Sequence, residues 1–146
     1  MVPPDIDSKL RLTLREGSVY YFTERTLTSA LPHYFIVVNA EPVAQQLLLL
    51  SVVTSKVEEV RRRRAERLDT LVEISPEIYD ILTKPSIVDC NSLKTIPLAE
   101  FNARFVRGEI ACFDKDLPGA LRKALRRAIH ASDILAEELK ALVARA

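Results

Sequence analysis

Short strand-like segments separated by turns constrain the fold of this chain more than any other feature of its sequence. One segment alternates leucine with polar residues, and the others are short runs of apolar, β-branched and aromatic residues. They lie at 10–15, 19–22, 34–38, 47–53, 70–74, 86–90, 93–96 and 109–113. Such segments are typical of β-strands, and no regular strand–helix alternation argues for a parallel sheet. We therefore expect a mainly β protein with helices (α+β), built on a small coiled antiparallel sheet or SH3-like barrel.

Helical patterns interrupt these strands at three places. Residues 56–67 are rich in helix formers, and Glu58 lies four residues before Arg62, a spacing that supports a helix. A disordered loop is the alternative for this charged segment. A serine, proline and glutamate in succession predict a short helix or helical turn over 76–82, and apolar spacing predicts a helix over 97–106.

The length of 146 residues fits a single domain. We expect residues 1–9 to form an irregular arm, 10–113 a β-rich barrel body and 115–146 two C-terminal helices with leucine stripes. The start lacks a signal-peptide pattern, and no apolar run approaches the roughly 20 residues of a membrane helix. Cys90 and Cys112 sit in apolar runs that suit free thiols and give no zinc signature. The expected location is the reducing cytoplasm.

Overall charge gives no sign of a nucleic-acid ligand, because basic and acidic residues nearly cancel to a net charge of +1. Any basic surface must therefore be local, and the obvious candidate is the run Arg61–Arg64. Four consecutive arginines point all around a helix, and neighbouring glutamates offset much of their charge. A solvated charged helix is the more common use of such a run. If the run contacts phosphates instead, binding should weaken steeply with salt.

Four short motifs, in this order and spacing, give the chain a resemblance to a known family. They are Gly17-Ser18-Val19-Tyr20, His33-Tyr34-Phe35-Ile36-Val37-Val38, Leu50-Ser51-Val52-Val53-Thr54-Ser55, and Ser86-Ile87-Val88-Asp89-Cys90-Asn91-Ser92-Leu93-Lys94-Thr95-Ile96. Together they resemble the MazF/PemK (Kid/CcdB-like) toxins over about residues 16–129, as a divergent member. The arginine and proline that the family places before one strand fall on His33 and Tyr34. A later Asp-Gln becomes Asn91-Ser92, and its arginine becomes Lys94.

The resemblance implies an endoribonuclease toxin of a toxin–antitoxin system. Such an enzyme cleaves single-stranded RNA through attack of the ribose 2′-hydroxyl, with no metal and no cofactor. It implies catalytic roles for His33, Thr54 and Ser55, and its further substrate-binding residues would be Lys56, Asn91, Ser92 and Lys94. The implied partners are single-stranded RNA, an antitoxin protein and a second copy of the chain in a homodimer.

Each of these residues also has an ordinary structural interpretation. A lone histidine at a strand start is commonly a surface or hydrogen-bonded residue, and a Thr-Ser pair after a strand commonly bonds its own backbone. Asp89 in an apolar strand belongs to the site, faces solvent by alternation, or caps a loop together with Asn91 and Ser92. His130 suits a helix C-terminus. Two other functions stay open for the whole chain. One is a catalytically inactive binding module, and the other is a structural homo-oligomer formed through the terminal helices.

Overall fold

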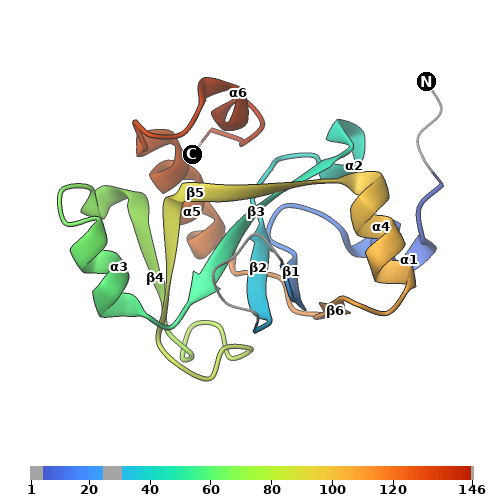
Figure 1. The fold of residues 1–146 in the computed structure, drawn as a ribbon, viewed down its shortest axis with the longest axis horizontal. Coiled ribbons are helices and arrows are strands. Elements are labelled where there is room, and N and C mark those ends of the chain that lie inside the picture. The colour runs from blue at the N-terminus through green and yellow to red at the C-terminus, as the bar shows by residue number, and fades with distance from the viewer. Residues whose placement is uncertain (1–4, 25–30, 146) are drawn as a thin grey trace.

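Six antiparallel strands form one sheet in the order β4-β5-β3-β2-β1-β6 (Figure 1). The computed structural model describes residues 5–24 and 31–145. The strands are β1 Val19–Phe22, β2 His33–Val37, β3 Leu47–Thr54, β4 Leu71–Ile74, β5 Ser86–Pro97 and β6 Ala111–Cys112. The antiparallel α+β fold is confirmed. The expectation of a barrel is wrong, because β4 and β6 end the sheet and do not pair with each other in the described chain.

Helices cover both faces of this sheet. They are α1 Ser8–Thr13, α2 Pro42–Gln45, α3 Val57–Arg63, α4 Leu98–Val106, α5 Gly119–Ala131 and α6 Glu137–Lys140, with a 3₁₀ turn η1 at Leu68–Thr70. Figure 1 shows α1 and α4 together at one end of the sheet and α3 at the opposite end, while α5 lies near β4 and α6 lies at the top of the view.

The strands bury side chains on both faces because successive residues of a strand point in opposite directions. In β2, Phe35 and Val37 pack in a cluster with residues of α1 and α4. Ile36 and Val38 belong to the second cluster, which includes the apolar stripe of α5 and the buried Val143 near the C-terminus. The leucine stripes of both terminal helices therefore pack against their own chain.

Residues 10–13 belong to α1, where the sequence predicted a strand over 10–15, so that prediction is wrong. Asp7 caps α1, since its carboxylate accepts hydrogen bonds from the backbone N–H groups of Lys9 and Leu10 at 2.9 and 3.3 Å. Leu10 and Leu14 are buried, whereas Leu12 is 77% exposed. Alternating leucines also place two residues four apart on one helix face, and here the cap favours the helix.

Other boundaries differ from the sequence prediction in detail. The segment 76–82 forms turns, in which the N–H of Tyr79 donates to the backbone oxygen of Ser75 at 3.0 Å, so a turn is present and a longer helix does not form. The connection between β2 and β3 contains α2. The segments 86–90 and 93–96 are one continuous strand, β5, and the segment 109–113 has only the two residues of β6 in the sheet. The charged segment 56–67 contains α3, which confirms the helical alternative.

Both cysteines are free thiols, Cys90 in the core and Cys112 half-buried. None of the helices in the described part of the chain has the length and apolar character needed to cross a bilayer.

Candidate functional site

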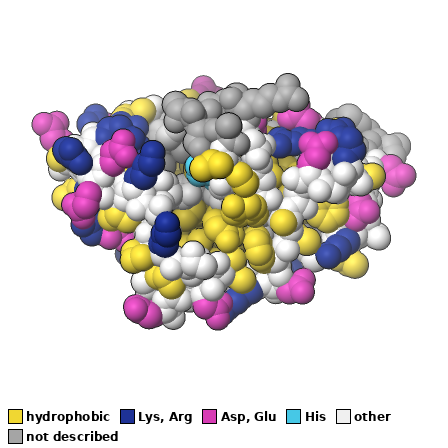
Figure 2. Space-filling view, turned by 60° about the horizontal axis from the view of Figure 1, so that its bottom comes forward, with side chains coloured by type: hydrophobic (Ala, Val, Ile, Leu, Met, Phe, Trp, Pro, Cys, Tyr) yellow, Lys and Arg dark blue, Asp and Glu magenta, His cyan; other side chains and the backbone are white. Residues whose placement is uncertain are grey.

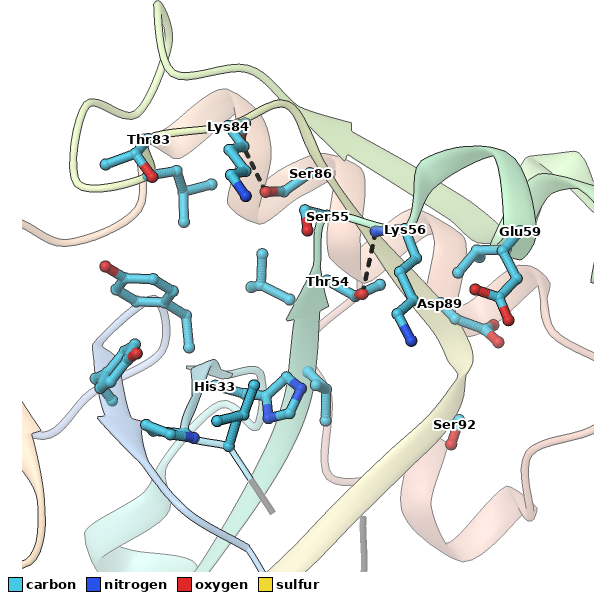
Figure 3. Close-up of a pocket in the computed structure, with 18 of the residues that line it drawn as sticks. His33, Thr54, Ser55, Lys56, Glu59, Thr83, Lys84, Ser86, Asp89 and Ser92 are labelled. Atoms are coloured by element: carbon cyan, nitrogen blue, oxygen red, sulfur yellow. Dashed lines mark hydrogen bonds between the residues drawn. The ribbon is translucent and has the colours of Figure 1, made fainter. Parts of the chain in front are cut away.

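An open cavity of about 800 Å³ lies where β2 begins and β3 ends, between α3 and the segment that leads into β5. Six of the seven residues that the resemblance implies for the site line this cavity. They are His33, Thr54, Ser55, Lys56, Ser92 and Lys94. Residues from three separate strands are thus brought to one opening, and Figure 3 shows the labelled members around it.

Strand pairing places His33 beside Thr54. Tyr34 of β2 lies opposite Val53 of β3 in the antiparallel ladder, so His33 and Thr54 occupy the next opposite positions. Opposite residues in such a ladder have Cβ atoms about 4.5–5.5 Å apart. In Figure 3 the side chains of His33, Thr54 and Lys56 extend into the same opening.

The His33 ring has an unused hydrogen-bonding atom. Its Nδ1 is buried and has no hydrogen-bond partner among the described residues, while the side chain as a whole is half-buried. Buried polar atoms in folded proteins usually have a partner. A purely structural histidine would be expected to satisfy this nitrogen, so the missing partner sets His33 apart from an ordinary structural histidine.

Thr54 makes the local hydrogen bond expected of a turn residue. Its Oγ1 accepts the backbone N–H of Lys56 at 3.2 Å. A hydroxyl group that accepts one hydrogen bond still has a proton to donate. Ser55 and Lys56 are exposed at the mouth of the cavity. The local bond therefore fixes the backbone after β3 and leaves the hydroxyl proton of Thr54 available.

An irregularity in β5 decides which of its residues reach the cavity. The step from Ser51 to Val53 on β3 corresponds to the step from Leu93 to Val88 on β5, so β5 carries extra residues there. Such irregularities bend a strand and redirect its side chains. Figure 1 shows β5 bending in its middle.

Asn91 lies in this irregular part and does not line the cavity, contrary to its expected substrate-binding role. Its amide donates to Thr70 Oγ1 at 2.7 Å and to Asp89 Oδ1 at 2.9 Å, and its carbonyl oxygen accepts from Ser132 Oγ at 2.7 Å. Asn91 is 5% exposed. Because these bonds join β5 to η1 and to the end of α5, Asn91 has a structural role, and we leave it out of the candidate site.

Asp89 lines the cavity and binds arginines of α3. Its Oδ2 accepts from Arg64 Nε at 2.9 Å and lies 3.4 Å from a terminal nitrogen of Arg63. Burial raises the pKa of the Asp89 carboxyl, but hydrogen bonds from Arg64 and Asn91 outweigh burial and hold that pKa below its usual range. Asp89 is therefore an ionised partner of α3.

Cations outnumber carboxylates on the cavity lining. The charged residues there are Lys56, Arg63, Lys84 and Lys94 against Glu59 and Asp89. Figure 2 shows hydrophobic side chains gathered beside a histidine on one face of the molecule, with Lys and Arg side chains to the left of it. A local basic surface thus exists in a chain of nearly zero net charge. Lys84 carried no signal in the sequence, since only folding brings the loop before β5 to this cavity.

Among the described residues, no group of three or more His, Cys, Asp and Glu side chains is arranged to hold a metal ion.

Comparison with known proteins finds solved structures with a similar fold and finds no similar sequence. No protein-family model matches the chain, and no curated protein matches it. An endoribonuclease from a mycobacterial species, solved in complex with its cognate antitoxin, aligns with a TM-score of 0.52 at 14% identity, over 80% of this chain and 90% of its own. The Mycobacterium tuberculosis toxin MazF-mt6 aligns with a TM-score of 0.50 at 18% identity, over 82% of this chain and 99% of its own. At this low identity the likeness establishes the fold, and the chain therefore has the MazF-like α+β fold that the resemblance in its sequence predicts.

Proposed function

We propose that this chain is an RNA-directed domain that cleaves single-stranded RNA in the cytoplasm without a metal ion. The observation that carries the proposal is the position of His33 and Thr54 at neighbouring ends of β2 and β3, on an open cavity whose charged lining residues are mostly cations. The likeness to an endoribonuclease and to a MazF toxin supports the same class of reaction.

The proposed reaction needs a base, an acid and donors for negative charge. The 2′-oxygen of one nucleotide bonds to the adjacent phosphorus as the bond to the 5′-oxygen breaks, which leaves a cyclic phosphate. A base removes the 2′-proton, and an acid protonates the departing oxygen. A histidine can perform either proton transfer near neutral pH, so His33 is the proposed acid or base. The hydroxyls of Thr54 and Ser55 and the ammonium of Lys56 would stabilise the charged phosphorane.

The test is cleavage of a single-stranded RNA by the purified full-length protein in the presence of a metal chelator. We expect His33→Ala to slow cleavage by about 100-fold or more, the usual contribution of a general acid or base. Thr54→Ala should reduce the rate by a comparable factor if its hydroxyl donates to the phosphorane. Thr95→Ala is the matched control, because Thr95 is exposed on β5 and outside the cavity lining.

Intact RNA at high concentrations of folded wild-type protein would overturn the nuclease proposal. Equal activity in His33→Ala and the wild type would remove His33 from the mechanism. Cleavage that needs an added divalent ion would contradict the metal-independent reaction.

A catalytically inactive binding module is the second candidate function. Two observations favour it. A histidine stands where the resembling family commonly has arginine, and the Thr54 hydroxyl already accepts a backbone hydrogen bond. This candidate predicts that the wild type binds the same RNA and leaves it intact.

We also propose an antitoxin partner and a homodimer. One structural neighbour was solved with its cognate antitoxin, which supports the first of these. A small upstream reading frame that encodes a DNA-binding domain and an acidic tail would strengthen the antitoxin proposal. Light scattering of the purified chain at micromolar concentration measures whether it is a dimer.

A further inference from the structure

One face of α3 forms a wall of the cavity. Its lining residues are Lys56, Glu59, Val60 and Arg63, at spacings of three, four and seven residues from the first. Residues with these spacings lie on the same side of a helix. Val60 is 3% exposed and anchors this face, while Arg63 extends from the last turn. Figure 3 shows Glu59 and Asp89 together on this side of the cavity.

The four consecutive arginines at the end of α3, the last of which is its C-cap Arg64, have different surroundings. Arg61 binds Glu58 and Glu73 on the side away from the cavity. Arg64 is mostly buried, with 23% of its side chain exposed, and binds Asp89. Arg62 is exposed and does not line the cavity. Only Arg63 combines a place on the cavity lining with an exposed side chain, at 54%.

Asp89 cannot neutralise both arginines that face it. Its Oδ1 accepts two hydrogen bonds from Asn91, and its Oδ2 is shared between Arg64 at 2.9 Å and Arg63 at 3.4 Å. The shorter contact belongs to Arg64, whose side chain is also the more buried. At this contact one carboxylate faces two guanidinium groups, and the more exposed of the two is that of Arg63. Glu59 also lines the cavity, but in the described part of the chain it forms no ion pair with either arginine.

We propose that Arg63 is a phosphate-binding residue of this cavity. This inference rests on the proposed RNA-directed function. A guanidinium group offers a planar fork that can bind two phosphate oxygens at once, which neither a histidine nor a lysine can do. An RNA phosphate can replace the long contact between Arg63 and Asp89, while Arg64 keeps Asp89 paired. The arginine fork thus comes from α3, on the other side of the cavity from the start of β2.

The experiment measures binding of a single-stranded RNA that carries 2′-O-methyl groups throughout, so that it cannot be cleaved by 2′-attack. Affinity is measured over a range of salt concentrations for the wild type, Arg63→Ala and Arg62→Ala. Arg62→Ala is the matched control, because it removes the same charge from the adjacent position. We expect Arg63→Ala to weaken binding about tenfold, as for loss of a charged hydrogen bond. The slope of log affinity against log salt should fall by about 0.7, as for one lost phosphate contact.

Arg62→Ala should weaken binding less than about twofold, because salt screens an exposed charge that lies outside the cavity lining. Arg63→Lys should restore the salt slope and recover only part of the affinity, because lysine keeps the charge and loses the fork. Melting temperatures of all variants check that they remain folded.

Equal losses for Arg62→Ala and Arg63→Ala would overturn this inference and show that the run acts only as diffuse charge. If the wild type binds or cleaves the RNA and Arg63→Ala does so equally well, this inference is overturned and the proposed function stays intact. Failure of the folded wild type to bind or cleave any single-stranded RNA would overturn the proposed function, and this inference with it.

Discussion

At the scale of single residues, Asp89 connects the candidate site to a buried hydrogen-bond network. Its carboxylate binds arginine side chains of α3, and it also accepts hydrogen bonds from the backbone and side chain of Asn91. Asn91 in turn bonds Thr70 and Ser132, which are both 1% exposed. A buried network of this kind stabilises the fold only while each member keeps its partner.

We predict that Asp89→Asn lowers the free energy of unfolding by about 3 kcal/mol at neutral pH, because it leaves the mostly buried Arg64 without its counter-charge. Urea denaturation measures this change. Asp133→Asn is the matched control, since Asp133 is 75% exposed in its ion pair with Arg67 and should contribute less than about 1 kcal/mol. Equal effects of the two changes would contradict a special role for Asp89.

The same pair predicts a dependence of stability on pH. The pKa of Asp89 is lower in the folded protein than its ordinary value, so its contribution is complete above about pH 4 and is lost as the pH falls through the folded pKa. Wild-type stability should therefore fall more steeply than that of Asp89→Asn as the pH drops below about 4. Parallel curves for the two proteins would show that Asp89 titrates alike in the folded and unfolded states.

Sequence motifs predicted the cavity position of His33 and Thr54, because both stand at ends of strands whose apolar runs are easy to recognise. Asn91 could not be placed this way. The irregular pairing within β5 changes which side chains face the cavity, and that pairing depends on the neighbouring strand. Lys84 was missed for a similar reason, since only the folded chain brings its loop to the cavity.

At the scale of elements, α5 is the main cover of one face of the sheet. Its residues Leu121, Leu125 and Ile129 are buried in the same cluster as Val88 of β5. The sequence predicted this helix because its apolar residues repeat with a period of about 3.6 residues over several turns.

We predict that Leu125→Ala destabilises the protein by about 3 kcal/mol, as for other buried leucines replaced by alanine. Leu125 is 2% exposed, so the change removes core contacts. Lys123→Ala on the exposed face of the same helix should change stability by less than about 0.5 kcal/mol. Chemical denaturation of both variants measures the difference, and a loss below about 1 kcal/mol for Leu125→Ala would contradict the packing described.

Short elements were harder to predict than α5. The leucines of 10–15 satisfy the period of a strand and the i, i+4 spacing of a helix equally well, and the capping Asp7 lies outside the alternating segment. The segment 76–82 has the start signal of a helix but forms only turns. Its Tyr79 is 1% exposed and donates its hydroxyl proton to the backbone oxygen of Lys115. Tertiary contacts of this kind are not visible in a local pattern.

At the scale of the whole molecule, the C-terminal residues belong to the core of their own chain. Val143 is 5% exposed in the α5 cluster, and the backbone oxygen of Leu142 accepts the N–H of Ala40 at 2.9 Å. His130 lies 3.1 Å from the backbone oxygens of Val143 and Ala144, which gives it a structural role.

We predict that deletion of residues 132–146 lowers the melting temperature and leaves the number of chains in the particle unchanged. The deletion removes the bond from Ser132 to Asn91 and the burial of Val143, which are both contacts within one chain. Thermal unfolding and light scattering of the full and shortened chains measure the two effects. A smaller number of chains in the particle after deletion would instead support the structural homo-oligomer formed through the terminal helices.

The two walls of the cavity differ in how freely they can be altered. β3 has a hydrogen-bonded strand on each side, so a change that moves Thr54 must disturb two ladders at once. In α3, Val60 is the only buried residue, and the exposed positions beside it can vary without loss of the fold. An engineer who wishes to change what the cavity binds should therefore randomise the exposed positions of α3 and keep the strand ends constant.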